Sequence, residues 1–250
     1  MQLGFGSGVL FGTQLTDNTG TAVTNPTPAR FGVLQEGTVS IASTIKELFG
    51  TDQFPVAVGR GTGKVTITAK AARIQANLWN AVYLGIPGGA TATKTDAIID
   101  EAATMAGTTY TVAKGTAFVA DLGVYYASTG LPLKAAAAAS GAGIYVPGAA
   151  GVGQYTFNAA DNAAALLFSY TYTHGGQKLA MVNTLLGYAP TFAADFYIPY
   201  QGKSLLVHAY QCVSDKFNIG SKLEDFIIPD FSASCFADSS GRVLDINVDE

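Results

Sequence analysis

The stretch PVAVGRGTGKVTITAKAARIQANLWNAVYLG, residues 55–85, decides the fold class, because strand periodicity and helical periodicity meet in it. Within residues 64–70, KVTITAK, apolar residues at odd positions alternate with polar residues at even positions. A period of two is typical of a strand with one face toward a core. The sequence therefore predicts a strand here. The glycine-rich segment before it, residues 59–63, is expected to connect this strand to the preceding one.

The segment GRGTGK, residues 59–64, has the composition of a phosphate-binding loop but not its spacing. The P-loop pattern needs a glycine where Val58 stands and a hydroxyl residue where Val65 stands. The dinucleotide pattern needs a third glycine at Lys64 and a helix after it, but a strand follows. We predict a basic turn that binds no cofactor. Arg60 and Lys64 are expected to pair with carboxylates of a neighbouring subunit.

One clear helix is predicted over residues 71–85, AARIQANLWNAVYLG, with Gly85 as its C-cap. Its apolar residues fall on one stripe at helical spacing. The stripe comprises Ala71, Ile74, Leu78, Ala81 and Val82, with Trp79 beside it. An apolar stripe of this kind packs against a sheet, and we expect that role rather than ligand binding.

Many further segments are rich in Tyr, Phe and β-branched residues, which favour strands. A first strand ends near Lys46, and candidates follow at 108–113, 122–126, 143–146, 153–157, 165–173, 191–200, 203–213, 224–237 and 242–248. Turns are expected at 175–176, 201–202 and 239–241. This pattern predicts a mainly β chain, an antiparallel β-sandwich or barrel with one flanking α-helix and long inter-subunit loops.

Three segments rich in small residues are harder to place. Residues 1–30 are rich in glycine and apolar side chains, so we interpret them as an N-terminal arm that docks on a neighbouring subunit. The alternative is an edge strand of the same domain. Residues 86–106 are predicted as a loop with a short helical turn at 96–103, and residues 135–143 are low in complexity.

The composition suggests a surface covered by other protein. Only 13% of the 250 residues are charged, 48% are hydrophobic, and the net charge is −4. So few charges indicate that much of the exterior lies against other copies. No apolar run approaches the ~20 residues of a membrane-spanning helix. The N-terminus has no early basic residue, so no signal peptide is expected, and the acidic balance does not favour a nucleic-acid surface.

Nothing in the sequence predicts chemistry. His174 and His208 have no carboxylate or cysteine at metal-ligand spacing, and Ser7 lacks the glycines of a nucleophile elbow. Cys212 and Cys235 are expected to be free buried thiols, with a strand-to-strand disulfide as the alternative. The acidic pairs are Asp100/Glu101, Glu224/Asp225 and Asp249/Glu250, and the last two are candidate partners of the basic turn. We expect no catalytic, cofactor-binding or metal-binding residues, and no enzyme.

Several strings resemble the tail tube (major tail) proteins of long-tailed bacteriophages. The match begins in TIKELFGTDQFPVAVGRGTGKVTITAKAARI, residues 44–74, where KELFG and FPVAV precede the basic glycine-rich segment. It continues through residues 121–173 and LLGYAPTF, 185–192, to DFIIPDFSASCFADSSGRVLDINV, 225–248. Together these strings cover most of the chain.

This resemblance implies a single tail-tube domain over residues 1–250, assembled as hexameric rings that stack into a hollow tube for DNA delivery. It implies contacts with the tape measure protein, the tail tip or baseplate and the terminator, and only transient contact with genomic DNA. The location would be the virion tail, after synthesis in the host cytoplasm. The chain is longer than the simplest tube subunit, so residues 86–164 are interpreted as an inserted lobe or loop region. Two alternatives stay open: another virion protein (capsid decoration or tail completion), or a β-sandwich module that binds carbohydrate or protein.

Overall fold

The computed structural model describes residues 6–73, 75–87, 91–221, 223 and 226–249. The chain is mainly β, as predicted, with 55% strand and 6% helix in antiparallel, sandwich-like sheets; the described strands close no barrel. It divides into two compact units. Unit 1 comprises Met1–Ala90 and Leu179–Glu250, and unit 2 comprises Thr91–Lys178. The sequence indicated an inserted lobe over 86–164; unit 2 overlaps that range and extends past it.

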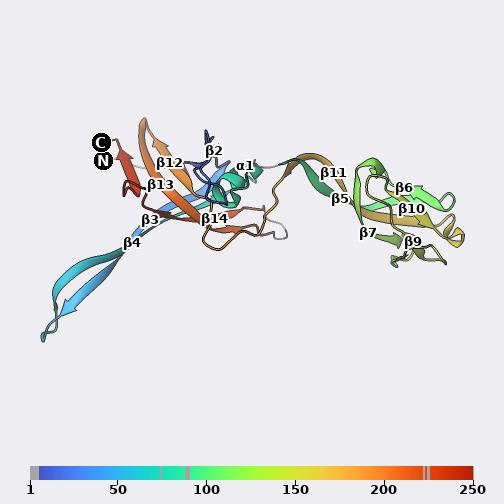
Figure 1. Ribbon diagram of the computed structural model, residues 1–250, viewed down its shortest axis with the longest axis horizontal. Helices are drawn as coiled ribbons and strands as arrows, with labels where there is room; N and C mark the ends of the chain where they lie inside the picture. Colours follow the sequence, from blue (N-terminus) through green and yellow to red (C-terminus); the bar gives the residue numbers. More distant parts are fainter. Residues whose placement is uncertain (1–5, 74, 88–90, 222, 224–225, 250) are drawn as a thin grey trace. The chain divides into compact units, whose positions relative to one another are not determined.

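Unit 1 is built on one eight-stranded sheet (Figure 1). Its strand order is β2-β1-β12-β13-β14-β4-β3, and β15 also pairs with β13. The strands are β1 (Val9–Gln14), β2 (Ala29–Arg30), β3 (Leu34–Phe49), β4 (Pro55–Ala71), β12 (Phe192–Tyr200), β13 (Lys203–Asn218), β14 (Asp230–Phe236) and β15 (Leu244–Val248). The long strand β13 pairs with β15 over its first part and with β14 over its second part.

The predicted helix exists but begins late. It comprises α1 (Ala76–Trp79), which continues as a π-helix, η1 (Asn80–Leu84), and ends at Gly85 in the left-handed region, φ 59°. Residue 71 is the last residue of β4 instead, where it pairs with Leu34. Strand pairing on both sides of β4 therefore overrides the helical pattern at its first turn.

The helix packs on the sheet of unit 1, as the stripe predicted. Leu78, Trp79 and Val82 are all buried. The Trp79 ring lies 4.1 Å from the Phe217 ring of β13, centroid to centroid. The stripe residue Ile74 lies outside the described residues.

The N-terminal segment does not leave its own unit as an arm. Strand β1 pairs with β12 on one side and with β2 on the other, and Leu10 is buried. A Cβ at Gly12 would lie 2.5 Å from Cγ1 of Val82, so only glycine lets β1 lie this close to the helix. This arrangement matches the alternative interpretation of residues 1–30, a strand of the same domain; residues 1–5 lie outside the described part.

Unit 2 consists of two small sheets. One has the order β5-β11-β7, and the other has the order β6-β10-β9-β8, in which only β8 and β9 are parallel. The strands are β5 (Thr91–Thr104), β6 (Thr109–Thr111), β7 (Phe118–Tyr126), β8 (Lys134–Ala135), β9 (Ile144–Val146), β10 (Gln154–Phe157) and β11 (Ala165–Lys178), with 3-10 turns η2 (Gly115–Ala117) and η3 (Ala159–Asp161). Aromatic rings from both sheets fill the core between them.

Two predictions for this region are wrong. Residues 91–104 form β5 rather than a loop with a helical turn at 96–103, because they pair with β11 along its length. The glycines at 175–176 lie within β11 and make no turn. The other strand candidates of unit 2 are confirmed.

Candidate functional site

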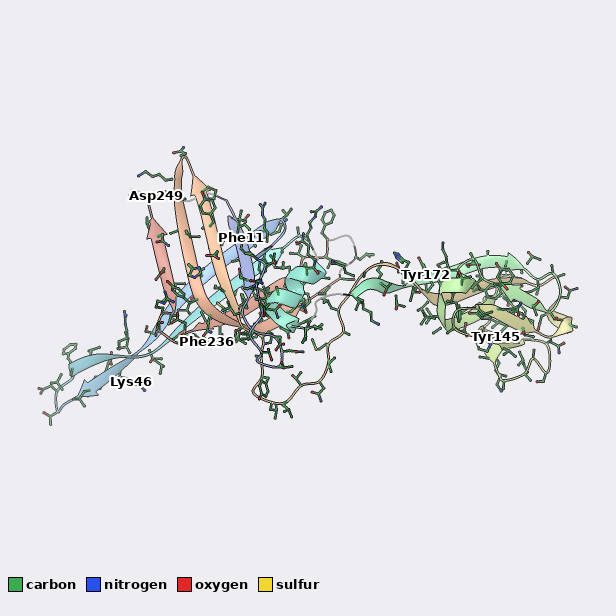
Figure 2. All side chains as sticks on the ribbon, turned by 45° about the horizontal axis from the view of Figure 1, so that its top comes forward. Phe11, Lys46, Tyr145, Tyr172, Phe236 and Asp249 are labelled. Atoms are coloured by element: carbon green, nitrogen blue, oxygen red, sulfur yellow. The ribbon has the colours of Figure 1, made fainter. Side chains whose placement is uncertain are left out.

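One exposed apolar surface of unit 1 lies on the hairpin of β3 and β4. The two strands pair from Leu34↔Ala71 to Phe49↔Pro55, but β14 pairs only with residues 65–70 of β4. Residues 42–64 therefore form a two-stranded ribbon, here named the projecting hairpin; Lys46 marks it in Figure 2. A two-stranded hairpin is marginally stable in water unless something packs on it.

Large apolar side chains occupy both faces of the projecting hairpin. Between 56% and 77% of each of six such residues is exposed, namely Ile45, Leu48, Phe49, Phe54, Val56 and Val58. Residues directly opposite each other share a face, so Leu48, which pairs with Ala57, lies on one face. Val58 pairs with Glu47 and lies on the other face. Both faces are therefore suited to contact with another protein surface.

The segment GRGTGK is part of the projecting hairpin and not a turn, which corrects the prediction for residues 59–64. Gly59 pairs with Lys46, and the connection between the strands lies at residues 50–54. β4 bulges opposite Thr44, and this bulge explains Gly61, where a Cβ would lie 2.5 Å from Oγ1 of Thr44. Gly59 and Gly63 have room for a Cβ. Glycine within a strand pattern signals a bulge, and that signal was present in the sequence.

Arg60 and Lys64 make no ion pair with any residue that the structure describes. Their predicted partners Glu224, Asp225 and Glu250 lie outside the described residues. Asp249 accepts hydrogen bonds from the backbone N–H and the hydroxyl of Ser204 at 2.7 and 3.0 Å. Its carboxylate is thus held within its own sheet.

A second apolar surface of unit 1 is the loop before β12, residues 179–191, here named the apolar loop. Between 53% and 102% of each of five large side chains in it is exposed, namely Met181, Val182, Leu185, Leu186 and Tyr188. Together with Tyr83 and Leu84 of the helix, the loop borders an open cleft of about 540 Å³. This surface differs in shape from the projecting hairpin, since it is a shallow cleft and not a ribbon.

The face of the sheet turned away from the core carries small hydroxyl residues. Ile67, Ala69, Phe231 and Ala233 are buried, so their neighbours in β4 and β14 point to the opposite face. Cross-strand rows on that face run Thr38–Thr68–Ser232 and Ser40–Thr66–Ser234. These two rows are polar and uncharged, and the next row on the same face is charged: it runs Glu36–Lys70–Asp230, with Lys70 paired to Glu36 at 2.6 Å.

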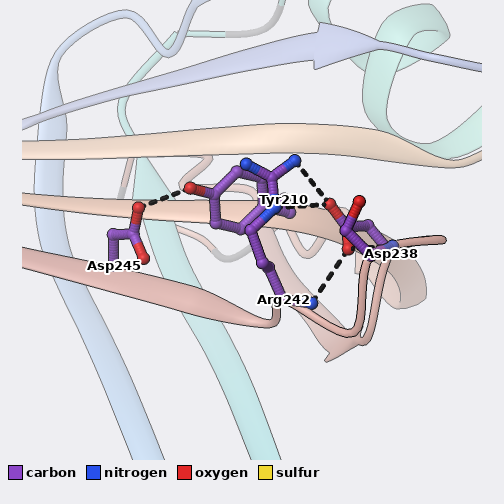
Figure 3. Close-up of polar contacts among 5 residues, drawn as sticks. Tyr210, Asp238, Arg242 and Asp245 are labelled. Atoms are coloured by element: carbon purple, nitrogen blue, oxygen red, sulfur yellow. Dashed lines mark hydrogen bonds and ion pairs between the residues drawn. The ribbon is translucent and has the colours of Figure 1, made fainter.

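The same face is acidic where β12, β13 and β15 meet (Figure 3). The patch holds three carboxylates and one arginine; it comprises Asp195, His208, Tyr210, Asp238, Arg242 and Asp245. The Arg242 guanidinium lies 4.1 Å from the centre of the Tyr210 ring and binds Asp238 through Nε and Nη2 at 3.0 and 2.8 Å. Tyr210 donates a hydrogen bond to Asp245, which raises the pKa of the phenol.

Each histidine has a carboxylate partner that sequence spacing could not reveal. His208 Nδ1 lies 2.6 Å from Oδ1 of Asp195 in the neighbouring strand, and His174 Nε2 lies 3.2 Å from Oδ2 of Asp96. Each aspartate lies in the strand next to that of its histidine, and the sequence alone does not give the register between the two strands. No group of three or more potential metal ligands occurs among the described residues.

The carboxylates inside unit 2 bind tyrosine hydroxyls. Asp121 accepts from Tyr145 at 2.6 Å and from Tyr155 at 2.8 Å, and Glu101 accepts from Tyr170 at 2.5 Å. Burial, together with these hydrogen bonds, raises the pKa of each phenol well above its ordinary value. Asp121, in β7, therefore links the two small sheets, because Tyr145 and Tyr155 belong to the other sheet.

No family model matches the chain, and no curated protein matches it. Among the described residues, no helix is long and apolar enough to cross a membrane.

Proposed function

We propose that the chain is the tail tube subunit of a long-tailed bacteriophage, a structural protein that stacks as hexameric rings into a hollow tube. The observation that carries this proposal is the pair of unlike apolar surfaces on unit 1, the projecting hairpin and the apolar loop. The sequence resemblance to tail tube proteins supports it. In this proposal the protein performs no catalysis.

Two unlike surfaces favour a polymer over a closed dimer. A two-fold dimer uses the same patch on both partners, whereas a ribbon that docks on a different surface makes a head-to-tail contact. Head-to-tail contacts generate rings and stacked filaments. An exposed ribbon with apolar side chains on both faces needs a covering partner, and a second copy of the chain supplies one.

The polar face of the sheet fits the lining of a tube that DNA must leave. A basic lining would hold DNA by counterion release and slow its passage. Here the hydroxyl rows carry no charge, Lys70 beside them is paired with Glu36, and the adjoining acidic patch repels phosphate. We therefore assign this face to the lumen.

Electron microscopy tests the proposal. We expect the purified chain to form hollow filaments in negative stain. The double variant Leu48→Ser/Val58→Ser removes one apolar side chain from each face of the projecting hairpin. Because both residues are exposed in the subunit, the variant should fold but sediment as a monomer or small oligomer.

A matched substitution separates this effect from a general loss of surface hydrophobicity. Leu131 in unit 2 is 62% exposed, close to the 63% of Val58. The variant Leu131→Ser should leave the filaments intact. Compact closed oligomers of the wild type would favour a decoration protein, and filaments of normal length from the hairpin variant would contradict the assigned contact.

A further inference from the structure

The two cysteines of the chain face each other across the centre of the unit 1 sheet. Cys212 of β13 pairs directly with Cys235 of β14, although they are 23 positions apart in sequence. Their Sγ atoms lie 2.9 Å apart. Directly opposite residues in antiparallel strands have Cα atoms about 4.5–5.5 Å apart, within the range that a disulfide spans. The backbone therefore needs no rearrangement to accommodate a bond between the two sulfur atoms.

The two thiols differ in their access to reagents. Cys212 is completely buried, whereas Cys235 is only partly buried and lies next to Phe236, the exposed end of β14. The hydrogen bond between the two thiols lowers the pKa of Cys235, while the same hydrogen bond and burial raise the pKa of Cys212. Cys235 is thus both the accessible thiol and the one that ionises first.

We propose that Cys212 and Cys235 form a thiol–disulfide site, which a small disulfide such as oxidised glutathione closes into a cross-strand bond. The Cys235 thiolate attacks one sulfur of the reagent, forms a mixed disulfide and expels one glutathione thiolate. Cys212 then gives up its proton and attacks Sγ of Cys235, which releases the second glutathione. Two protein thiols are oxidised to one disulfide, and one glutathione disulfide is reduced to two thiols.

The site goes beyond the proposed assembly and does not depend on it. Closing it joins β13 to β14, and β13 in turn pairs with β12 and β15. The bond also closes a loop through the connection between β13 and β14, which restricts the unfolded chain. A reducing cytoplasm would keep the site open, and an oxidising medium would close it.

Intact-mass spectrometry on the native full chain tests the site. After incubation with oxidised glutathione, denaturation and treatment with a maleimide, the wild type should carry no maleimide and no glutathione. Its mass should be lower by two hydrogens. The melting temperature measured by Trp79 fluorescence should rise by roughly 5–10 °C, and dithiothreitol should reverse this rise.

Single variants assign the order of the steps. Cys212→Ser should retain one glutathione on Cys235, because no second thiol displaces it. Cys235→Ser should retain none, because Cys212 is buried. If wild-type protein keeps both thiols reactive to maleimide after denaturation, or keeps a bound glutathione, the proposal is wrong. The wild-type measurement therefore tests the thiol–disulfide site even if a variant fails to fold.

Discussion

Strand β1 and the helix of unit 1 meet at a contact that a double-mutant cycle can test. An alanine Cβ at Gly12 would lie 2.5 Å from Cγ1 of Val82, where ordinary contact begins at 3.4 Å. The perturbation is Gly12→Ala, alone and combined with Val82→Ala. If β1 belongs to its own sheet, the first substitution forces the helix outward and the second removes the obstruction.

The geometry sets the expected magnitudes. Overpacking of this kind costs about 1–3 kcal/mol, and the lower entropy of the unfolded alanine chain offsets about 0.4–1 kcal/mol. We therefore expect Gly12→Ala to lower the free energy of unfolding by about 1–2 kcal/mol. Val82→Ala removes two fully buried methyl groups and should cost about 1–3 kcal/mol. In that background Gly12→Ala should cost almost nothing, which gives a coupling of about 1–2 kcal/mol.

Urea unfolding followed by tryptophan fluorescence measures these energies, because Trp79 is the only tryptophan and lies buried in unit 1. A matched control is Gly63→Ala in β4, where the new Cβ would meet only ordinary contacts at 3.7 Å. This control should change the unfolding free energy little. Additive costs at Gly12 and Val82 would show that β1 does not lie against the helix, and the interpretation of residues 1–30 as an arm would then stand.

Three further predictions concern the helix, the basic residues of the projecting hairpin and the Lys94–Asp96 pair in β5 of unit 2. Leu78→Asp buries a charge against the sheet and should cost several kcal/mol, so a soluble variant with native circular dichroism would contradict the helix placement. Arg60→Glu/Lys64→Glu should shorten filaments in electron microscopy without changing the melting temperature of the subunit, and ATP should shift that temperature in neither protein. Hydrogen bonding from Lys94 holds the pKa of Asp96 at about 2, below its ordinary 3.8, so the stability it contributes is present above about pH 4 and lost between about pH 4 and 2. Between about pH 4 and 2, calorimetry should show a smaller fall in melting temperature for Asp96→Asn than for the wild type. An equal fall in the two proteins would contradict a stabilising contact between Asp96 and Lys94.

The strands of this protein could largely be predicted from its sequence, and the reason is local. Segments such as 203–213 and 242–248 combine alternation with strand-favouring residues, and both form strands. The turn at 201–202 was also predictable, because Gln201 and Gly202 both adopt positive φ, at 50° and 80°. Such conformations favour Gly and a few polar residues.

The errors arose where pairing between distant strands overrides local preference. Residues 96–103 have the composition of a helical turn, but pairing with β11 makes them a strand. The glycines of GRGTGK favour a turn locally, but pairing with β3 makes the segment part of a strand. The Tyr210–Asp245 contact and both histidine–aspartate pairs depend on register, so no spacing within one segment could indicate them.

Thr91 and Lys178 pair with each other at the base of unit 2. The chain therefore enters and leaves this unit at adjacent points, and its removal creates a gap that a short turn can bridge. Unit 2 has the connectivity of an exchangeable cassette: it can be excised, shortened or replaced by a foreign domain with closely spaced termini while the strand order of unit 1 is kept. Variation within unit 2 is thereby uncoupled from the surfaces through which unit 1 is proposed to assemble.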